Sequence, residues 1–385
     1  MNERLTKDNT YSPDIIITLL AILAMSCFYH GMRVVIVCAI SALCCYAFEL
    51  LALKLLDKKL AFHDYSAAIT GVIIGLMMPA TVKYSVLIVT SFVAMIIAKH
   101  IFGGSGHEIF NPAAVAYAFA VLCWPNHVLM YPKTTTDLAL ANYVDVELTQ
   151  SFTSLFNSGS VTNNVDLEVL LGYFDGPIAC TQILVIFVCA VVLLMRRSVS
   201  LSAFIGFIGT FMSISFIAPA LTQMNTSDYM FYELSTNMLV FSGLFIVSDY
   251  RFLPAGALNR FIMGVFVACF TLMFRRIGDV ENPVMFAVLI TNPFVDVVDN
   301  YRVRFIAFIR GAGDENSEQR DKIRRVFEKV IIFFTWVANV IIDAVKKVFS
   351  LAFSFGKDND NKNEESLADE ISDKNVTEAE VNDEE

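Results

Sequence analysis

The chain has 385 residues, of which 56% are hydrophobic and 17% charged, and it contains 33 Phe. This composition excludes an ordinary soluble domain and indicates a polytopic membrane protein. The net charge of −10 comes from the tail, because residues 358–385 contain 12 Asp and Glu against two Lys. An acidic segment with almost no aromatic residue cannot bury a core, so we expect a disordered tail, and we expect no nucleic-acid partner.

Ten apolar runs set the expected architecture. We predict helices near residues 13–29, 34–56, 66–80, 84–102, 111–125, 177–195, 199–221, 235–250, 256–274 and 282–299. The runs at 66–80 and 111–125 are shorter than the roughly 20 residues of a full span, so they could be half-helices that meet inside the bilayer. The expected fold class is an all-α polytopic membrane protein with about ten transmembrane helices.

Basic residues give the expected orientation, because short cytoplasmic loops collect Lys and Arg. With both termini in the cytoplasm, most basic residues fall inside, and the pair Arg275 and Arg276 is discordant. The expected parts are a first membrane repeat at 1–125, an extracytoplasmic loop at 126–176, a second membrane repeat at 177–305, a basic segment with an interfacial amphipathic helix at 306–357, and the acidic tail at 358–385. An eleventh span at 326–355 is the alternative, and Asp343 in its middle argues against it.

The two halves carry similar stretches after a phenylalanine. GGSGHEIFNPAAVAYAF follows Phe102, and RRIGDVENPVMFAVLI follows Phe274. Because each half has five expected spans, an odd number, two repeats would be inverted relative to each other, with sites near the bilayer midplane. Chance similarity between two apolar, glycine-containing runs is the alternative.

The first of these stretches is the leading candidate site. Gly103, Gly104 and Gly106 permit positive φ and a close approach of the backbone to a ligand. Asn111 and Asn282 precede prolines at equivalent positions, where helix N–H groups converge and the helix dipole favours negative charge. A glycine-rich turn followed by a structural N-cap is the alternative.

Three stretches, one of which includes the glycine-rich segment, support a family resemblance. They are DYSAAITGVIIGLMMP at 64–79, IIAKHIFGGSGHEIFNPAAVAYAF at 96–119 and MFAVLITNPFVDVVD at 285–299, with a weaker match in LFIVSDY at 244–250. Together they resemble the D subunit of the Rnf ion-translocating electron-transport complex and its relative, the B subunit of the sodium-pumping NADH:quinone oxidoreductase. The resemblance implies a ten-span inverted-repeat fold within a membrane complex that carries flavins.

The resemblance also implies how the flavins are held. Such subunits carry FMN on a Thr of an S-G-A-T motif on the extracytoplasmic side, and riboflavin noncovalently within the membrane. The nearest equivalent is NSGSVT at 157–162, in which Val161 stands at the Thr position and has no hydroxyl. Thr162, one residue later, is the candidate for covalent FMN. The candidates for noncovalent flavin binding are Asn111, Gly104, Gly106 and Asn282.

Two other departures mark a divergent member of the family. Ala179-Cys180-Thr181 stands where the family usually has Gly-Glu-Thr, and Ser248-Asp249-Tyr250 replaces Thr-Asp-Pro. The part of the chain that would face the covalent flavin is therefore more altered than the Phe110-Asn111-Pro112 region.

Ionisable residues within predicted spans are by default functional or paired. Glu49 lies near Lys54, and an interfacial pair is expected there, whereas Lys99 and His100 are expected to be snorkelling anchors. Three acidic residues are expected to orient helix ends, with an ion pathway as the alternative: Asp249, Asp296 and Asp299. Of these, Asp249 lies close to Arg251 in the sequence.

The expected function is that of a membrane subunit of a flavin-dependent oxidoreductase complex that couples electron flow to Na⁺ or H⁺ movement across the bacterial cytoplasmic membrane. The sequence contains neither a nucleotide-binding fingerprint nor iron–sulfur spacing, so iron–sulfur and further flavin subunits are the expected partners. No metal site is expected. A flavin-free channel or transporter on the same scaffold is the first alternative, and a purely structural assembly subunit is the second.

Overall fold

A computed structural model of the chain describes residues 13–57, 65–133, 138, 140, 146–157, 172–179, 181–216, 226–236, 238–278, 280–295 and 297–299. All of them belong to one compact unit, Met1–Arg310. The predicted amphipathic helix and the acidic tail lie outside the described residues, as do Thr162 and Asp296.

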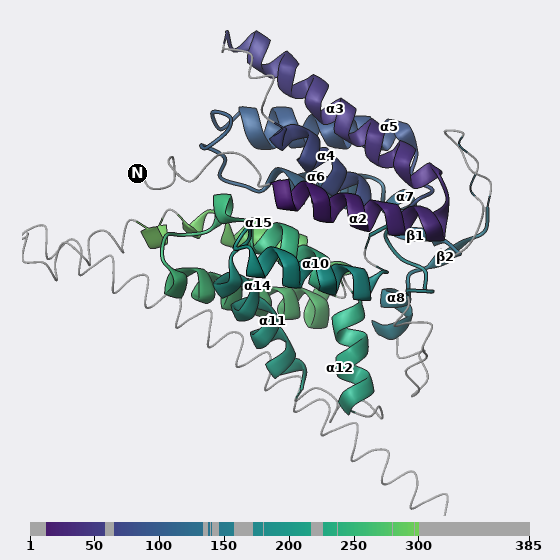
Figure 1. Ribbon diagram of the computed structural model, residues 1–385, viewed down its shortest axis with the longest axis vertical. Helices are drawn as coiled ribbons and strands as arrows, with labels where there is room; N and C mark the ends of the chain where they lie inside the picture. The colour runs from purple at the N-terminus through teal and green to yellow at the C-terminus, as the bar shows by residue number, and fades with distance from the viewer. Residues whose placement is uncertain are drawn as a thin grey trace, which may run out of the picture. The chain divides into compact units, whose positions relative to one another are not determined.

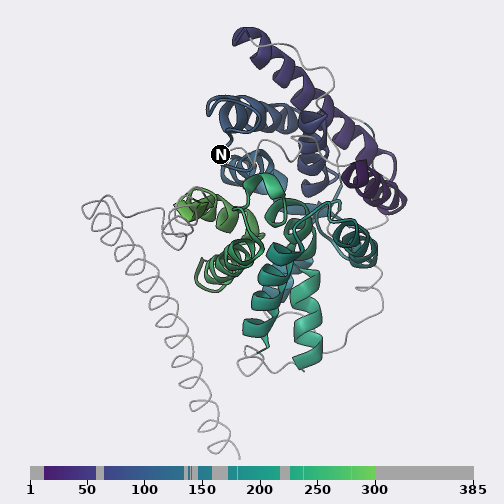
Figure 2. The same cartoon turned by 60° about the vertical axis from the view of Figure 1, so that its left-hand side comes forward.

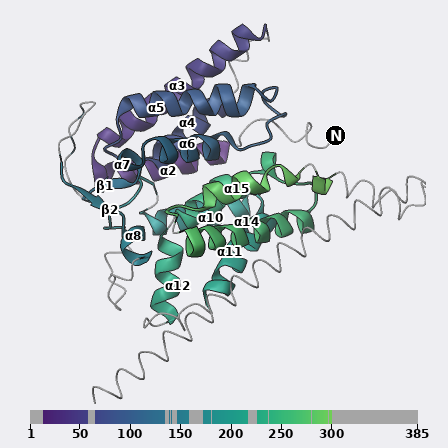
Figure 3. The same cartoon turned by 180° about the vertical axis from the view of Figure 1, so that it is seen from behind.

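The first half of this unit contains a series of apolar helices. They are α2 (Pro13–His30), α3 (Arg33–Leu55), α4 (Ser66–Met77), α5 (Tyr84–Phe92), its π-helical continuation η1 (Val93–His100), α6 (Pro112–Cys123) and the short α7 (Pro125–Val128). A two-stranded antiparallel ribbon follows, with β1 (Met130–Pro132) paired to β2 (Leu148–Gln150), and then α8 (Phe152–Asn157). The ribbon and α8 lie at one end of the helices (Figures 1 and 3).

The second half is again helical. Its elements are α10 (Ile183–Met195), α11 (Leu201–Ser215), α12 (Thr226–Ser235), α13 (Leu239–Ser242), the π-helical η3 (Gly243–Val247), the 3₁₀ turn η4 (Tyr250–Phe252), α14 (Ala257–Gly278) and α15 (Val284–Thr291). The helices of the first half, purple to blue, gather together, and those of the second half, teal to green, pack against them (Figures 1 and 2).

Three described helices are long and apolar enough to cross a membrane by themselves: Pro13–His30, Arg33–Leu55 and Ala257–Ile277. A fourth span results if Thr226–Ser235 and Leu239–Val247, which meet at an angle of 56°, count as one broken span. The other apolar helices are shorter than the roughly 20 residues of a full span. The structure thus confirms a helical protein with several apolar helices, whereas ten spans and inverted repeats stay predictions.

Three predicted helices differ clearly from the structure in their bounds. The predicted helix at 177–195 begins only at Ile183, because the backbone before it forms hydrogen bonds with the end of α4 instead of continuing the helix. The backbone N–H groups of Ile178 and Ala179 donate to the carbonyls of Met78 and Leu76, at 3.1 and 3.0 Å. These bonds satisfy carbonyls at the end of α4 that have no partner within that helix.

The last predicted helix, 282–299, is interrupted. α15 ends at Thr291, two residues before Pro293, which has no N–H to donate to a carbonyl of the preceding turn. The predicted run at 235–250 is likewise divided, and the break falls at Met238, whose φ of 52° is left-handed.

Glycines allow the backbones of two helix pairs to approach closely, α3 with α4 in the first half and α11 with α14 in the second. A Cβ atom on Gly71 of α4 would lie 2.6 Å from Ala42 Cα of α3, and one on Gly75 would lie 2.9 Å from Cys38 Cα. In the second half, Cβ atoms on Gly206 of α11 and Gly264 of α14 would collide with backbone carbonyls of the facing helix. Small residues at such positions let helix backbones approach closely, which is how helices associate in membranes.

An ion pair and a hydrogen bond show how α2 and α10 are oriented relative to each other. α2 and α10 run antiparallel, since Asp14 at the start of α2 pairs with Arg196 after α10 (2.8 Å) and Ser26 accepts from Gln182 before α10 (2.8 Å). Within this frame, the core contains Ile22, Ile74 and Phe211, all fully buried.

Candidate functional site

The glycine loop between η1 and α6, residues 101–110, is a turn held by backbone bonds. Gly103, Gly104 and Gly106 adopt φ of 118°, 88° and 89°, which explains why glycine stands at each position. The N–H of Gly104 donates to Lys99 O at 3.1 Å, and that of His107 to Gly104 O at 3.0 Å. Flavin binding by Gly104 and Gly106 stays a prediction.

Asn111 ends this loop and caps α6. Its Oδ1 accepts hydrogen bonds from the N–H groups of Ala113 (3.0 Å) and Ala114 (3.4 Å), and Pro112 occupies the first helical position. Asn is among the preferred N-cap residues because it satisfies N–H groups that have no partner within the helix. The side chain is buried, at 3% exposure. The cap accounts for Oδ1, and a flavin contact stays a prediction.

A buried charge cluster anchors the other side of the loop. Lys99 Nζ lies 3.0 Å from Glu49 Oε1, and His100 Nε2 lies 2.8 Å from Glu49 Oε2. Lys99 Nζ also donates to Ser66 Oγ at 3.1 Å, at the start of α4. We call Glu49, Lys99 and His100 the Glu49 clamp, because it joins α3, η1 and, through Ser66, α4.

The Glu49 clamp corrects two expectations. Glu49 pairs with Lys99 and His100 instead of Lys54. Lys99 and His100 are not snorkelling anchors, since their side chains are only 3% and 4% exposed. The expected pairing assumed neighbours along one helix, whereas the structure brings the end of η1 against the end of α3.

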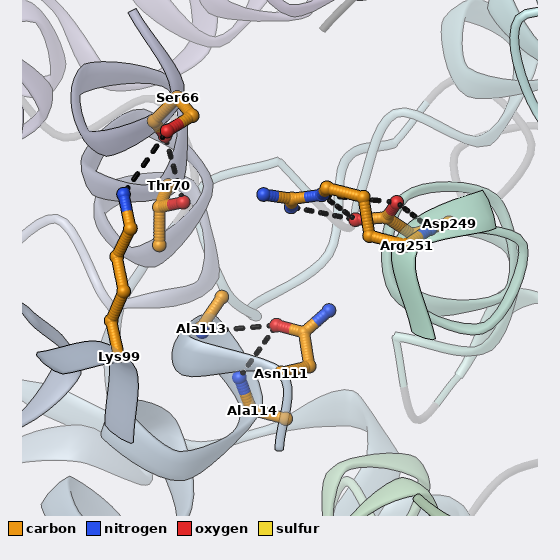
Figure 4. A network of polar contacts seen from close by, with 8 residues as sticks. All are labelled: Ser66, Thr70, Lys99, Asn111, Ala113, Ala114, Asp249 and Arg251. Carbon is orange, nitrogen blue, oxygen red and sulfur yellow. Dashed lines mark hydrogen bonds and ion pairs between the residues drawn. The ribbon is translucent and has the colours of Figure 1, made fainter. Parts of the chain in front are cut away.

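A second ion pair lies near the loop and belongs to the second half. Arg251 Nη2 lies 2.7 Å from Asp249 Oδ2, and Asp249 Oδ1 also accepts from the Arg251 N–H at 3.0 Å. The expected proximity of Asp249 to Arg251 is thus confirmed. Figure 4 shows Lys99 reaching to Ser66, Asn111 turned to Ala113 and Ala114, and Arg251 paired with Asp249 on another segment of the chain.

Glu108 of the glycine loop connects these groups electrostatically. Its carboxyl interacts with Arg251 and Asp249 of the second half and with Lys99 and Glu49 of the first. Burial raises the pKa of this carboxyl, and the effect outweighs the lowering by Arg251 and Lys99. The region where the two halves meet therefore contains a carboxyl that holds a proton more readily than an exposed one.

The second Asn-Pro pair has a different local structure. Asn282 adopts φ of 57° and does not cap α15, and its Nδ2 donates to Tyr117 Oη of α6 at 2.8 Å. Both side chains are buried, so this bond ties the segment before α15 to the first half. A flavin contact of Asn282 stays a prediction.

The residue before Asn282 forms part of another polar group. Tyr131 Oη of β1 donates to Glu281 Oε1 at 3.3 Å, and Ser151 also donates a hydrogen bond to this carboxyl. Burial raises the pKa of Glu281 to about 7. Among sequence signals, only the position of Glu281 directly before the second Asn-Pro pair could have indicated this residue.

A second clamp explains the discordant arginines. Glu233 of α12 pairs with Arg275 and with Arg276, the latter at 3.0 Å, near the end of α14. Tyr229 donates to Glu233 Oε1 at 2.6 Å, and the Arg275 guanidinium lies over the Phe156 ring. We call Glu233, Arg275 and Arg276 the Glu233 clamp. Arg275 is buried and paired, so it is not a loop residue that reports membrane orientation.

Comparison with known proteins places the chain in a family. The model of the NQR2, RnfD, RnfE family matches residues 6–306. The chain belongs to this family. The matched range contains both clamps, the glycine loop and both Asn-Pro pairs.

Relatives in the family are similar over most of their length. The D subunit of an ion-translocating oxidoreductase complex from Actinobacillus succinogenes is 23% identical, and the match covers 74% of this chain and 90% of that protein. The D subunit of a Na⁺-translocating ferredoxin:NAD⁺ oxidoreductase complex from Acetobacterium woodii is also 23% identical, with coverage of 75% and 87%. The D subunit of a proton-translocating complex of the same type from Clostridium ljungdahlii is 22% identical, with coverage of 71% and 82%.

Proposed function

We propose that the chain is the D-type membrane subunit of an ion-translocating oxidoreductase complex and takes part in coupling electron transfer to Na⁺ or H⁺ movement. The observation that carries this proposal is the family match over residues 6–306, together with coverage of more than four fifths of each relative named above. Its partners would be the other subunits of that complex. The alternation of apolar helices with buried, paired charges supports a role in which ions pass near the chain.

The finer architecture belongs to the same proposal. Ten spans in two inverted repeats of five, in the bacterial cytoplasmic membrane and with both termini in the cytoplasm, agree with the distribution of Lys and Arg outside the buried clamps. The short helices α4, α6 and α15 would then be half-helices that end within the bilayer.

Coupled transport tests the function. Inverted membrane vesicles from cells with and without the gene are supplied with reduced ferredoxin and NAD⁺, and Na⁺ and H⁺ uptake are measured alongside NADH formation. We expect uptake and NADH formation to be lost together without the gene. Unchanged uptake would contradict the proposal. Cation flux through liposomes that contain the purified chain alone, without an electron donor, would favour the flavin-free channel or transporter.

Flavin attachment is a separate part of the proposal. Thr162 would carry FMN on a phosphoester, less reliably than a regular motif because Val161 occupies the usual position. Both residues lie outside the described residues. Mass spectrometry of wild type, Thr162→Val and Val161→Thr, expressed with a flavin transferase, tests it. An FMN adduct in Thr162→Val would refute the assignment.

Noncovalent riboflavin near Asn111 is the third part. Because Asn111 Oδ1 caps α6, Asn111→Asp and Asn111→Ser keep the capping ability, whereas Asn111→Leu removes it. If Asn111 contacts flavin, Asn111→Leu removes flavin from a subunit that still assembles. If it only caps, Asn111→Asp and Asn111→Ser keep full flavin content and Asn111→Leu only lowers the yield.

A further inference from the structure

Each half of the chain places one glutamate in the segment that leads to its Asn-Pro pair. Glu108 lies three residues before Asn111, and Glu281 lies directly before Asn282. Both side chains are partly buried, and both lie between helices. Neither glutamate belongs to the Glu49 clamp or the Glu233 clamp. Neither carboxyl is therefore neutralised by an ion pair with the basic residues of those clamps.

The surroundings of Glu108 leave its carboxyl available. The two cations that act on it, Lys99 and Arg251, are already paired with Glu49 and Asp249. Within the described ranges, none of the ion pairs includes Glu108. A half-buried carboxyl that interacts with two satisfied ion pairs gains by binding one more monovalent cation, because that cation removes a charge from a region of low dielectric.

The described partners of Glu281 are neutral. Tyr131 and Ser151 donate hydrogen bonds to the carboxyl, and among the described residues no charged group contributes to the shift of its pKa. Burial brings the pKa of this carboxyl to about 7, so it changes charge near neutral pH. Tyr131 lies in the ribbon at one end of the helices, which gives Glu281 a position next to a connecting segment instead of inside a helix pair (Figure 3).

The two glutamates are connected to the chain on either side of α6. Glu108 lies four residues before the first residue of α6. Glu281 accepts a hydrogen bond from Tyr131, which lies eight residues after the last residue of α6, with α7 between them. The Asn282–Tyr117 bond connects the Glu281 segment to the middle of the same helix.

We propose that Glu108 and Glu281 are the two carboxyls at which this subunit exchanges its cation, H⁺ or Na⁺, one in each half of the chain. The proposal rests on the ion-translocating function proposed above. Binding converts a carboxylate and one cation into a neutral pair, and release restores both, so the step needs no other reactant. The carboxylates of Glu49 and Glu233 are unsuitable for exchange, since each already lies between two basic side chains.

The test uses the whole complex, purified and reconstituted into proteoliposomes. Glu108→Gln and Glu281→Gln keep the size of each side chain and remove its charge. The matched controls are Asp57→Asn and Glu147→Gln, two exposed acidic residues in connecting segments. Subunit composition, flavin content, electron-transfer rate and cations moved per electron are measured for each variant.

We expect both glutamate variants to assemble with full flavin content and to move at least about tenfold fewer cations per electron, whereas the controls behave as wild type. Varying Na⁺ at fixed pH distinguishes the cation. If the wild type depends on Na⁺ and Glu281→Gln does not, the carboxyl binds Na⁺; if only the dependence on pH disappears, it binds H⁺. Glu281→Asp, which keeps the charge, should retain transport.

Two results separate the possible failures. If the wild-type complex moves cations and both glutamine variants move as many per electron with an unchanged pH profile, the assignment of Glu108 and Glu281 is wrong. If the wild-type complex transfers electrons without moving any cation, the proposed function fails instead. A loss of transport in Asp57→Asn or Glu147→Gln equal to that of the glutamate variants would also overturn the assignment.

Discussion

At the residue scale, Glu233 is a carboxylate without exposed surface that two arginines compensate. Removing one partner of a buried ion pair costs roughly 3–5 kcal/mol, because the remaining charge stays buried. Glu233→Gln would leave Arg275, 2% exposed, without its carboxylate. We therefore expect a large loss of folded protein and a lower midpoint of thermal unfolding in detergent, measured by the fluorescence of a thiol-reactive dye.

Glu147→Gln is the control for this prediction. Glu147 pairs with Lys133 at 3.7 Å, but its side chain is 89% exposed, and exposed ion pairs contribute little to stability. The midpoint of Glu147→Gln should match that of the wild type. If Glu233→Gln unfolded at the same temperature as Glu147→Gln, the Glu233 clamp would not stabilise the fold.

Glu281 predicts a pH dependence of stability at the same scale. Its pKa is about 7 in the folded chain against 4.5 for the ordinary carboxyl, so between these values the folded state binds more protons than the unfolded state. Stability therefore falls as pH rises through this window. The glutamine variant lacks this titration. We expect the midpoint of the wild type, minus that of Glu281→Gln, to decrease from about pH 5 to about pH 7.

Unfolding of both proteins in the same detergent, at closely spaced pH values, measures this difference. Taking the difference removes the contribution of every other titrating group that the two proteins share. A difference that stays constant, or that increases with pH, would mean that burial does not favour the protonated form of Glu281.

At the element scale, glycines set the distance between α11 and α14. A methyl group on Gly264 would collide with the Ala203 carbonyl, which cannot move without shifting α11. Overpacking of this kind typically costs about 1–3 kcal/mol. We expect Gly264→Ala to lower the midpoint of thermal unfolding. Gly209→Ala on α11 is the matched control, because nothing lies within 4 Å of the position that its methyl group would take, and alanine favours a helix by about 1 kcal/mol.

The contrast between the two alanine variants is the measurement. Gly209→Ala should unfold at or above the wild-type temperature, and Gly264→Ala below it. Equal midpoints for the two variants would show that α11 and α14 are not held at the distance that the glycines indicate.

The sequence was sufficient to predict the positions of some helices but not the ends of others. Apolar runs and the Asn-Pro pairs predicted the positions of α2, α3, α6 and α14, because periodic burial and proline act locally. Helix ends near 177 and 235 were mispredicted, since the backbone there is decided by bonds to α4 and by the left-handed Met238.

Pairing across the fold could not be predicted from the sequence. Glu49 and Lys99 are 50 residues apart, and Glu233 and Arg275 are 42 apart, so nothing in their local sequence indicates the partner. The Tyr117–Asn282 bond, which joins residues 165 positions apart, belongs to the same class. Motif position could indicate Asn111 and Asn282, but only the structure shows that one caps a helix and the other joins the two halves.

At the scale of the whole molecule, the clamps change how the basic residues are interpreted. Lys99, Arg275 and Arg276 compensate carboxylates inside the chain, so they carry no information about the side of the membrane. The remaining basic residues of the predicted loops still favour the cytoplasm for both termini. Removing Arg275 and Arg276 from the count makes this distribution more one-sided than the sequence alone indicated.

The last prediction is the membrane orientation of the two polar segments. If residues 126–176 are extracytoplasmic and the tail is cytoplasmic, a cysteine at Asn142 is accessible from outside and one at Ser372 is not. Intact cells that express each single-cysteine variant are treated with a membrane-impermeant maleimide, and permeabilised cells provide the control for reactivity. We expect Asn142→Cys to be labelled in both preparations and Ser372→Cys only after permeabilisation. Labelling of Ser372→Cys but not Asn142→Cys in intact cells would reverse the topology, and with it the side of the membrane toward which each end of α6 points.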